Sequence, residues 1–219
     1  MTTKTPAAAW QDLAAGNDRF VSGEPMHPRQ EVERRAEIAT GQAPIAALFG
    51  CSDSRLSAEI IFDVGLGDLF VIRNAGQVIS ESVLGSLEYA VAVLHVPLIV
   101  VLGHDSCGAV LAAIDSQTAD AAALPPHISN LISRIVPAVR RVAASDGAFS
   151  AQGSIDASLV DSHDVGREHL RDTIAELLKE SELISDAIAA GTLAIVGANY
   201  SLLEGRARRD TVIGSIQPS

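Results

Sequence analysis

The stretch IAALFGCSDSR, residues 45–55, indicates the fold class of this chain. Its first five residues are all apolar, and the run stops at Gly50, just before a cysteine and a polar turn. Strands that are buried on both faces of a parallel sheet show this unbroken pattern, because helices cover both sides. Three further apolar runs of this kind lie at 69–72, 98–102 and 193–196.

Helical patterns alternate with the apolar runs, at 57–63, 80–95, 106–115, 127–143 and 164–190. Alternating strands and helices predict an α/β domain with a mostly parallel central β-sheet flanked by helices. After Tyr200, the pattern SLLEGRARRDTVIGSI predicts a hairpin that turns near Gly205 and adds a C-terminal edge strand.

The segment before the first strand has a different character. Residues 6–21 place apolar side chains along one helical stripe, and a second short helix is predicted at 34–38. The stripe could pack on its own domain or reach across a partner, and the sequence leaves both readings open. We treat residues 1–219 as a single domain, with an N-terminal helical arm over 1–40 and an α/β core over 41–219.

The composition excludes several classes of function. The 219 residues carry a formal net charge of −11, so binding to nucleic acid is not expected, because the phosphate backbone requires a positive surface. No apolar stretch approaches the ~18 residues of a membrane span, and the first ten residues lack the apolar region of a secretory signal. Two cysteines without an export signal indicate the cytoplasm, where cysteines more often hold a metal than form a disulfide.

The second cysteine lies in GHDSCGA, residues 103–109, directly after the apolar run at 98–102. In open α/β sheets, ligands bind beyond the carboxyl ends of the strands, at the point where the strand order reverses. If the first strand lies between the second and the third, this point falls between the strands that are followed by Cys51 and His104. We therefore expect these two side chains to lie close together.

Thiolate and imidazole are the ligands that zinc prefers, and Cys51, His104 and Cys107 supply three of them. Three protein ligands leave a fourth position open, which is typical of a catalytic site. Asp53 could fill that position, or it could pair with Arg55 and leave the metal open to water. A single buried cysteine is usually a small hydrophobic residue, but two cysteines at two strand ends favour a metal site.

CSDSR and HDSC, about fifty residues apart, resemble the two metal-binding motifs of the β-class carbonic anhydrases. The resemblance runs over nearly the whole chain, from AAW…GNDRF through RNAGQVI, GSLEYAV and LIVVLGHDSCGAV to LAIVGANY, and it is strongest to actinobacterial members. It implies an enzyme that uses Zn²⁺ to hydrate CO2 reversibly to bicarbonate and a proton. In that family Cys51, His104 and Cys107 would hold zinc, and Asp53 with Arg55 would form a dyad whose carboxylate accepts a hydrogen bond from zinc-bound hydroxide.

The resemblance also implies a substrate site and an assembly. Gln42 matches a glutamine that donates a hydrogen bond to the substrate. The small apolar CO2 pocket would be lined by Phe70, Ala75, Tyr89 and Gly108. Ala75 stands where many relatives carry valine, so this wall is expected to be looser. The active sites of the family lie at a dimer interface covered by the N-terminal arms, and the dimers often pair into tetramers, so a homodimer or homotetramer is expected.

One departure from the family concerns regulation. Some bacterial relatives bind inhibitory bicarbonate at a second site with a tryptophan three residues before the first cysteine, and this chain has Leu48 there. Arg73 matches the arginine of that site, but it occurs widely in the family. We do not expect bicarbonate inhibition through that pocket.

Three other functions are considered. Hydrolysis of carbonyl sulfide or carbon disulfide uses the same metal ligands in related proteins, and the sequence does not separate it from CO2 hydration. A non-catalytic zinc domain would not need Arg55 or Gln42. A nucleotide-binding domain is not favoured, because no Gly-x-Gly-x-x-Gly motif follows the first strand.

Overall fold

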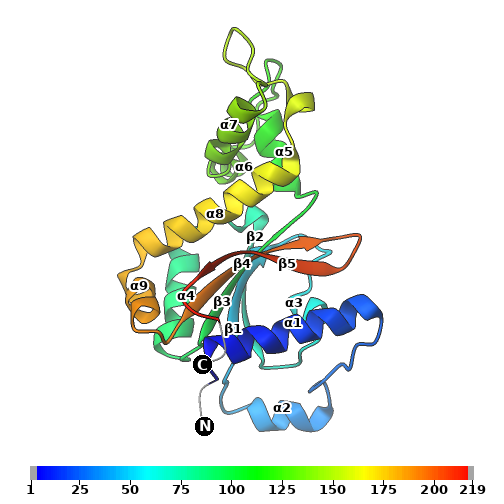
Figure 1. Ribbon diagram of the computed structural model, residues 1–219, viewed down its shortest axis with the longest axis vertical. Coiled ribbons are helices and arrows are strands. Elements are labelled where there is room, and N and C mark those ends of the chain that lie inside the picture. The colour runs from blue at the N-terminus through cyan, green and yellow to red at the C-terminus, as the bar shows by residue number, and fades with distance from the viewer. Residues whose placement is uncertain (1–3, 217–219) are drawn as a thin grey trace.

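The computed structural model describes residues 4–216, and a five-stranded sheet lies at its centre (Figure 1). The strands are β1 (Ala46–Cys51), β2 (Leu69–Asn74), β3 (Leu98–His104), β4 (Ala194–Ser201) and β5 (Arg206–Ile213). Their order is β2-β1-β3-β4-β5, and all neighbours are parallel except β5, which runs antiparallel to β4. The predicted parallel sheet with a C-terminal edge strand is confirmed, and the strand order reverses between β1 and β3.

The central strands are buried on both faces. Every residue of β1 and of β3 is buried. Successive residues of β1 belong to different apolar clusters: Leu48 packs into one, and Phe49 packs into the other. Two covered faces explain why the apolar runs in the sequence are continuous rather than alternating.

Helices cover both faces of the sheet (Figure 1). One apolar cluster contains side chains from α4 (Glu81–Ala92), α8 (Ser162–Glu180) and α9 (Glu182–Ala189). The other contains side chains from α1 (Pro6–Ser22), α3 (Ala58–Ile61), α5 (Gly108–Asp115), α6 (Pro126–Ile132) and α7 (Val136–Ser145). The short helix α2 (Val32–Ile38) has no buried residue. None of the helices within residues 4–216 has the length and apolar character that crossing a bilayer requires.

Two predicted helices are each divided in two. The helix expected at 127–143 is interrupted between α6 and α7, where Pro137 lies in the first turn of α7, because proline has no N–H to continue the preceding helix. The helix expected at 164–190 is interrupted at Ser181, whose hydroxyl accepts a hydrogen bond from the Ile184 N–H and so begins α9. Hydrophobic periodicity alone does not resolve such breaks.

The helical arm packs on its own domain, which is the first of the two readings left open by the sequence. Leu13, a residue of α1, is fully buried. The Asn17 side-chain amide donates to the carbonyl oxygens of Ile61 at 3.0 Å and Gly205 at 2.8 Å, and its oxygen accepts from the Ala207 N–H at 2.9 Å. Satisfied polar contacts of this kind fix α1 against both the end of α3 and the β4–β5 turn.

Candidate metal centre

The carboxyl ends of β1 and β3 bring three ligand side chains together. Cys51 is the last residue of β1, His104 is the last residue of β3, and Cys107 is the N-cap residue of α5. One ligand atom of each residue lies within 4.8 Å of the others, and all three residues are buried. The convergence that was predicted from the strand-order reversal is confirmed.

The spacing of the two sulfurs fits a tetrahedral metal. The Sγ atoms of Cys51 and Cys107 lie 4.0 Å apart, and both cysteines are free. Two Zn–S bonds of ~2.3 Å that meet at a tetrahedral angle would separate the sulfurs by roughly 3.8 Å. The pair is therefore arranged to share an ion.

The imidazole of His104 offers its second nitrogen to the same point. His104 Nδ1 lies 2.8 Å from the carbonyl oxygen of Asp105, and because a carbonyl can only accept, Nδ1 carries the proton. Nε2 is then left with a lone pair, and it is buried without a partner among the described residues. Metal-bound histidines usually donate their other ring nitrogen to a carbonyl or carboxylate in this way. The donor set of two sulfurs and one imidazole nitrogen fits zinc.

The surroundings of Cys51 favour its thiolate. The hydrogen bond with Cys107 lowers the pKa of Cys51, while burial opposes this change and a hydrogen bond from the Gly76 amide assists it. The same bond between the sulfurs raises the pKa of Cys107. Binding of a divalent cation between the two sulfurs would displace the proton of this hydrogen bond.

The carboxylate of Asp53 is held by Arg55 and is not part of the converging group. Arg55 Nε lies 2.9 Å from Asp53 Oδ1 and Nη2 lies 2.7 Å from Oδ2, so the pair is bidentate. The side-chain hydrogen bonds from Arg55 hold the pKa of Asp53 well below its usual range. Arg55 Nη2 also reaches the carbonyl oxygen of Ser106 at 3.3 Å. The structure shows the ion pair, and the role of Asp53 as a metal ligand stays a prediction.

Arg73 is a structural part of the site whose contacts the sequence did not predict. Its Nε donates to the carbonyl oxygen of Cys51 at 2.9 Å, and its Nη2 donates to the carbonyl oxygen of Asp53 at 2.6 Å. Arg73 pairs with Gly50 in the β1–β2 register, so a correct strand alignment is the signal that could have found it. Leu48, which lies in β1 like Gly50, is buried in the core.

The predicted substrate residues divide into two groups. Ala75 directly follows β2 and Gly108 begins α5, so both adjoin the metal centre of their own chain, and both are exposed. Phe70 instead pairs with Ala47 near the amino end of β1, and its ring centroid lies 6.1 Å from that of Tyr89.

The second group is distant from the metal centre of its own chain. At ~3.3 Å per residue, the strand rises by roughly 13 Å between the level of Phe70 and the level of Cys51. Gln42 lies in the irregular segment before β1, at the end of the strand opposite to Cys51, and is exposed. Phe70 and its partner Tyr89 are therefore far from the cysteines of their own chain.

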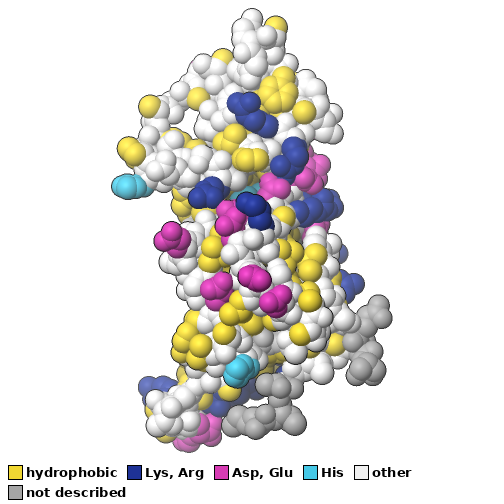
Figure 2. Space-filling view, turned by 90° about the vertical axis from the view of Figure 1, so that its left-hand side faces the viewer, with side chains coloured by type: hydrophobic (Ala, Val, Ile, Leu, Met, Phe, Trp, Pro, Cys, Tyr) yellow, Lys and Arg dark blue, Asp and Glu magenta, His cyan; other side chains and the backbone are white. Residues whose placement is uncertain are grey.

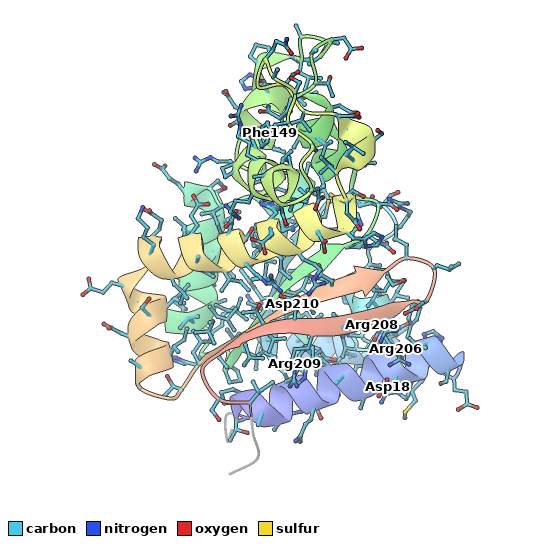
Figure 3. All side chains as sticks on the ribbon, turned by 45° about the horizontal axis from the view of Figure 1, so that its top comes forward. Asp18, Phe149, Arg206, Arg208, Arg209 and Asp210 are labelled. Atoms are coloured by element: carbon cyan, nitrogen blue, oxygen red, sulfur yellow. The ribbon has the colours of Figure 1, made fainter. Side chains whose placement is uncertain are left out.

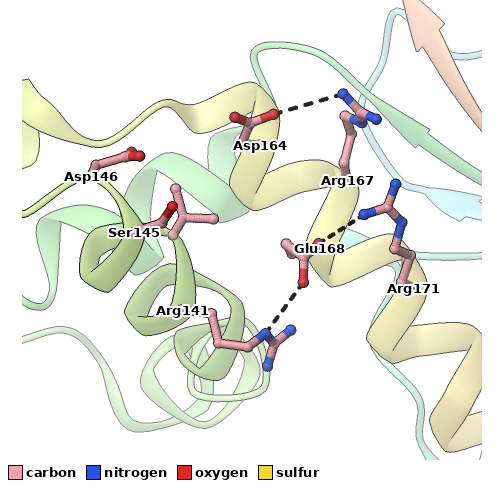
Figure 4. Close-up of a pocket in the computed structure, with 8 residues that line it drawn as sticks. Arg141, Ser145, Asp146, Asp164, Arg167, Glu168 and Arg171 are labelled. Carbon is pink, nitrogen blue, oxygen red and sulfur yellow. Dashed lines mark hydrogen bonds and ion pairs between the residues drawn. The ribbon is translucent and has the colours of Figure 1, made fainter.

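A cavity of about 390 Å³ lies between α7 and α8, apart from the metal centre (Figure 4). Its three arginines, Arg141, Arg167 and Arg171, are each paired with carboxylates. These ion pairs join α7, α8 and β5, and they leave no arginine in this cavity free to bind an anion.

Comparison with known proteins agrees with this geometry. The family model described as carbonic anhydrase matches residues 46–207. Carbonic anhydrase 2 of Mycobacterium tuberculosis is 50% identical, over 99% of this chain and 98% of its own length. The carbonic anhydrase of Mycolicibacterium smegmatis is 45% identical, over 99% of this chain and 98% of its own length.

Solved structures of low sequence identity share the fold. A structure described as a tetrameric β-carbonic anhydrase from Sordaria macrospora matches with a TM-score of 0.66 at 23% identity, covering 92% of this chain and 96% of that chain. The Coccomyxa β-carbonic anhydrase in complex with acetazolamide matches with a TM-score of 0.67 at 22% identity, covering 97% of this chain and 90% of that chain.

Proposed function

The chain belongs to the β-class carbonic anhydrases, zinc enzymes that hydrate CO2 reversibly to bicarbonate, and from this premise we propose how its residues divide the reaction. The observation that carries the assignment is the convergence of two sulfurs with a ring nitrogen of His104, whose Nε2 has no partner among the described residues. Zinc, when bound, supplies the Lewis acidity that makes water nucleophilic near neutral pH. Cys51, His104 and Cys107 would hold it.

Asp53 and Arg55 orient the attacking water. Arg55 keeps the Asp53 carboxylate ionised and fixes both of its oxygens, so the carboxylate can accept a hydrogen bond from the nucleophile and can direct its lone pair at CO2. The guanidinium of Arg73 supports this step indirectly, because it holds the backbone on both sides of Ser52. In this proposal Asp53 is the residue that contacts the reacting atoms, and Arg55 positions it.

The first turn of α5 stabilises charge that develops on the substrate. Gly108 begins this helix beside the Cys107 ligand, and its amide belongs to the helix N-terminus, where N–H groups have no helical partner. Amides in this position favour a developing carboxylate. Ala75 would form the adjoining apolar wall.

We propose that Gln42, Phe70 and Tyr89 reach the metal centre of a second copy, and that the homodimer is the smallest active unit. The open edge of β2 supports this, because within residues 4–216 β2 pairs with β1 alone and most of its residues are apolar. If two β2 strands pair antiparallel around a two-fold axis near Ile72, Phe70 of one copy faces Asn74 of the partner subunit. Asn74 is the register partner of Cys51, so the aromatic pair would approach the neighbouring site.

The opposite edge of the sheet has the composition of an edge that stays unpaired. Strand β5 carries three arginines, and these are Arg206, Arg208 and Arg209 (Figure 3). Arg206 forms an ion pair with Asp18 of α1 at 2.7 Å. Charged side chains on an edge strand discourage pairing with another chain. The side of the molecule that carries α4 and α9 shows many apolar side chains, with several acidic ones among them (Figure 2).

The shared site can be tested by complementation between two inactive variants. Gln42→Ala keeps the metal ligands, and Cys107→Ser keeps the glutamine. In a mixed dimer, the intact ligands of the first subunit meet the intact Gln42 of the second, so one of the two sites is complete. Random mixing makes half of the dimers mixed, so activity should return to about a quarter of the wild-type value.

Stopped-flow CO2 hydration before and after joint refolding measures this recovery. If Gln42 acted within its own chain, every site in the mixture would lack either the glutamine or the metal, and activity would stay at background. A mixture of Gln42→Ala with wild type is the control for subunit exchange.

We also propose a cytoplasmic location. Cys51 and Cys107 are free thiols that must stay reduced to bind the metal, and a reducing compartment preserves them.

A further inference from the structure

The residue His169 of α8 is a buried imidazole that the reaction described above does not use. It is 2% exposed and lies on the face of α8 that otherwise packs Leu170, Ile174 and Leu177 into the core. A buried polar group is costly unless it is hydrogen-bonded. His169 Nε2 lies 2.7 Å from the carbonyl oxygen of Gly76, whereas Nδ1 has no partner among the described residues.

The bond to Gly76 defines the protonation of the ring. Because a carbonyl oxygen can only accept, Nε2 must carry the proton. Burial lowers the pKa of His169, although the Gly76 bond opposes this effect, so the ring is neutral and Nδ1 is bare. A bare Nδ1 agrees with the absence of a partner at that nitrogen in residues 4–216.

Gly76 in turn contacts a metal ligand. Its N–H donates to Cys51 Sγ at 3.3 Å. Gly76 has a φ of 74°, and a Cβ at this position would lie 2.8 Å from the Cβ of Ala109. The next residue, Gln77, also has a positive φ, of 41°, which is unusual for a side chain of this size. The turn that presents the amide to the sulfur is therefore strained and needs support from outside.

Helix α8 supplies that support through His169, which donates from Nε2 to the carbonyl oxygen of Gly76 at 2.7 Å. One turn later, the Thr173 hydroxyl lies 2.9 Å from the carbonyl oxygen of His169 and 3.3 Å from that of Gln77, so its single proton goes mainly to its own helix. The contact from His169 is the shorter one, and it fixes the residue whose amide faces the sulfur.

We propose that His169 is a positioning residue of the metal centre, which holds the Gly76 carbonyl so that the Gly76 amide stays directed at the Cys51 sulfur. This inference rests on the metal centre proposed above. The amide withdraws charge from the thiolate and fixes its direction. Loss of an outer hydrogen bond of this kind typically lowers metal affinity or activity about 10- to 100-fold.

A pair of variants of similar length tests the role of the N–H group. His169→Gln keeps a donor at nearly the same distance from the backbone, and His169→Met removes it. Zinc affinity, measured by competition with a chelator, should fall about tenfold or more in His169→Met and should be mostly restored in His169→Gln. In the cobalt(II) protein, the thiolate charge-transfer band of His169→Met should move to longer wavelength, because a thiolate without its amide bond gives up charge more easily.

Ile174→Val is the matched control for core packing. Ile174 lies on the same buried face of α8, but it packs toward Gly197 of β4 rather than toward the turn at Gly76. This variant should lower the unfolding temperature and leave both the zinc affinity and the cobalt band unchanged. Unchanged values for a folded His169→Met would overturn the inference, and His169 would then be a packing residue only.

The wild-type protein provides a measurement that does not depend on a variant folding. With ¹¹³Cd in place of zinc, NMR should show a scalar coupling between cadmium and the Gly76 amide proton, and the ¹⁵N shifts of His169 should show the Nε2–H tautomer. An Nδ1–H tautomer would overturn the inference. Failure of the wild type to bind metal through its cysteines would overturn the proposed function itself, so the two failures are distinguishable.

Discussion

The two ends of the β1–β2 strand pair differ in whether one chain gathers buried functional residues there. At the carboxyl end, Cys51 is only 5% exposed and takes part in a converging set of ligands. At the amino end, Tyr89 is 45% exposed, and Gln42 is also exposed. The difference supports the proposal that a single chain builds the metal site, whereas Gln42, Phe70 and Tyr89 serve the site of a second copy.

The largest effect is expected from loss of a metal ligand at the carboxyl end. Cys107→Ser replaces a thiolate with a hydroxyl that ionises far less readily, so most of the zinc should be lost and CO2 hydration should fall to background. Elemental analysis of the purified variant measures the occupancy. Full occupancy would show that Cys107 is not a ligand.

A large effect with the metal retained is expected from Arg55→Ala. Without the guanidinium fork, the Asp53 carboxylate is no longer held away from the metal and can become a ligand, so turnover should fall by about 10²-fold or more while zinc stays bound. Arg55→Lys is the matched control, because it keeps the charge but loses the fork, and it should recover only part of the activity. Zinc loss as the primary defect in Arg55→Ala would contradict the proposed role.

A smaller effect is expected from a charge on the exposed apolar side of α4. Val93 is 54% exposed at the end of this helix, near Tyr89 in the chain. Val93→Asp should weaken self-association and reduce activity about tenfold, with the zinc content unchanged, because a buried unpaired charge is costly in an interface. Light scattering measures the assembly. Leu203→Asp, at the β4–β5 turn, changes an equally apolar exposed residue and should alter neither property.

The smallest effect on activity is expected from a change at Asp63, which holds the N-terminal arm by hydrogen bonds. Burial alone would raise the pKa of Asp63, but hydrogen bonds from the amides of Met26 and His27 and from the Arg19 side chain outweigh it, so the pKa is lowered. A lowered pKa stabilises the fold above the ordinary pKa of aspartate, and this stability is lost as the pH falls through the folded-state value.

Asp63→Asn should therefore lower the free energy of unfolding by about 1–3 kcal/mol at pH 7 and by less near pH 3, with little change in zinc content. Urea unfolding at the two pH values measures the difference. An equal loss at both values would mean that the charge of Asp63 contributes nothing.

Local sequence patterns predicted the parts of the molecule that depend on strand and helix periodicity. The apolar runs before Cys51 and His104 indicated buried parallel strands, and the strand-order rule then placed the ligands together. The breaks at Pro137 and Ser181 were missed, because apolar periodicity continues across them.

The contacts that complete the site could not be predicted from one sequence. The Arg73 bonds to backbone carbonyls depend on the strand register, and the bond between His169 and Gly76 joins residues 93 positions apart. The orientation of the His104 ring depends on a backbone carbonyl that no sequence pattern reveals.

Zinc K-edge X-ray absorption of the purified wild-type protein tests the central claim most directly. The account predicts two sulfur neighbours at about 2.3 Å and two nitrogen or oxygen neighbours at about 2.0–2.2 Å. A zinc shell without sulfur, or one made of four sulfurs, would contradict the metal centre formed by Cys51, His104 and Cys107.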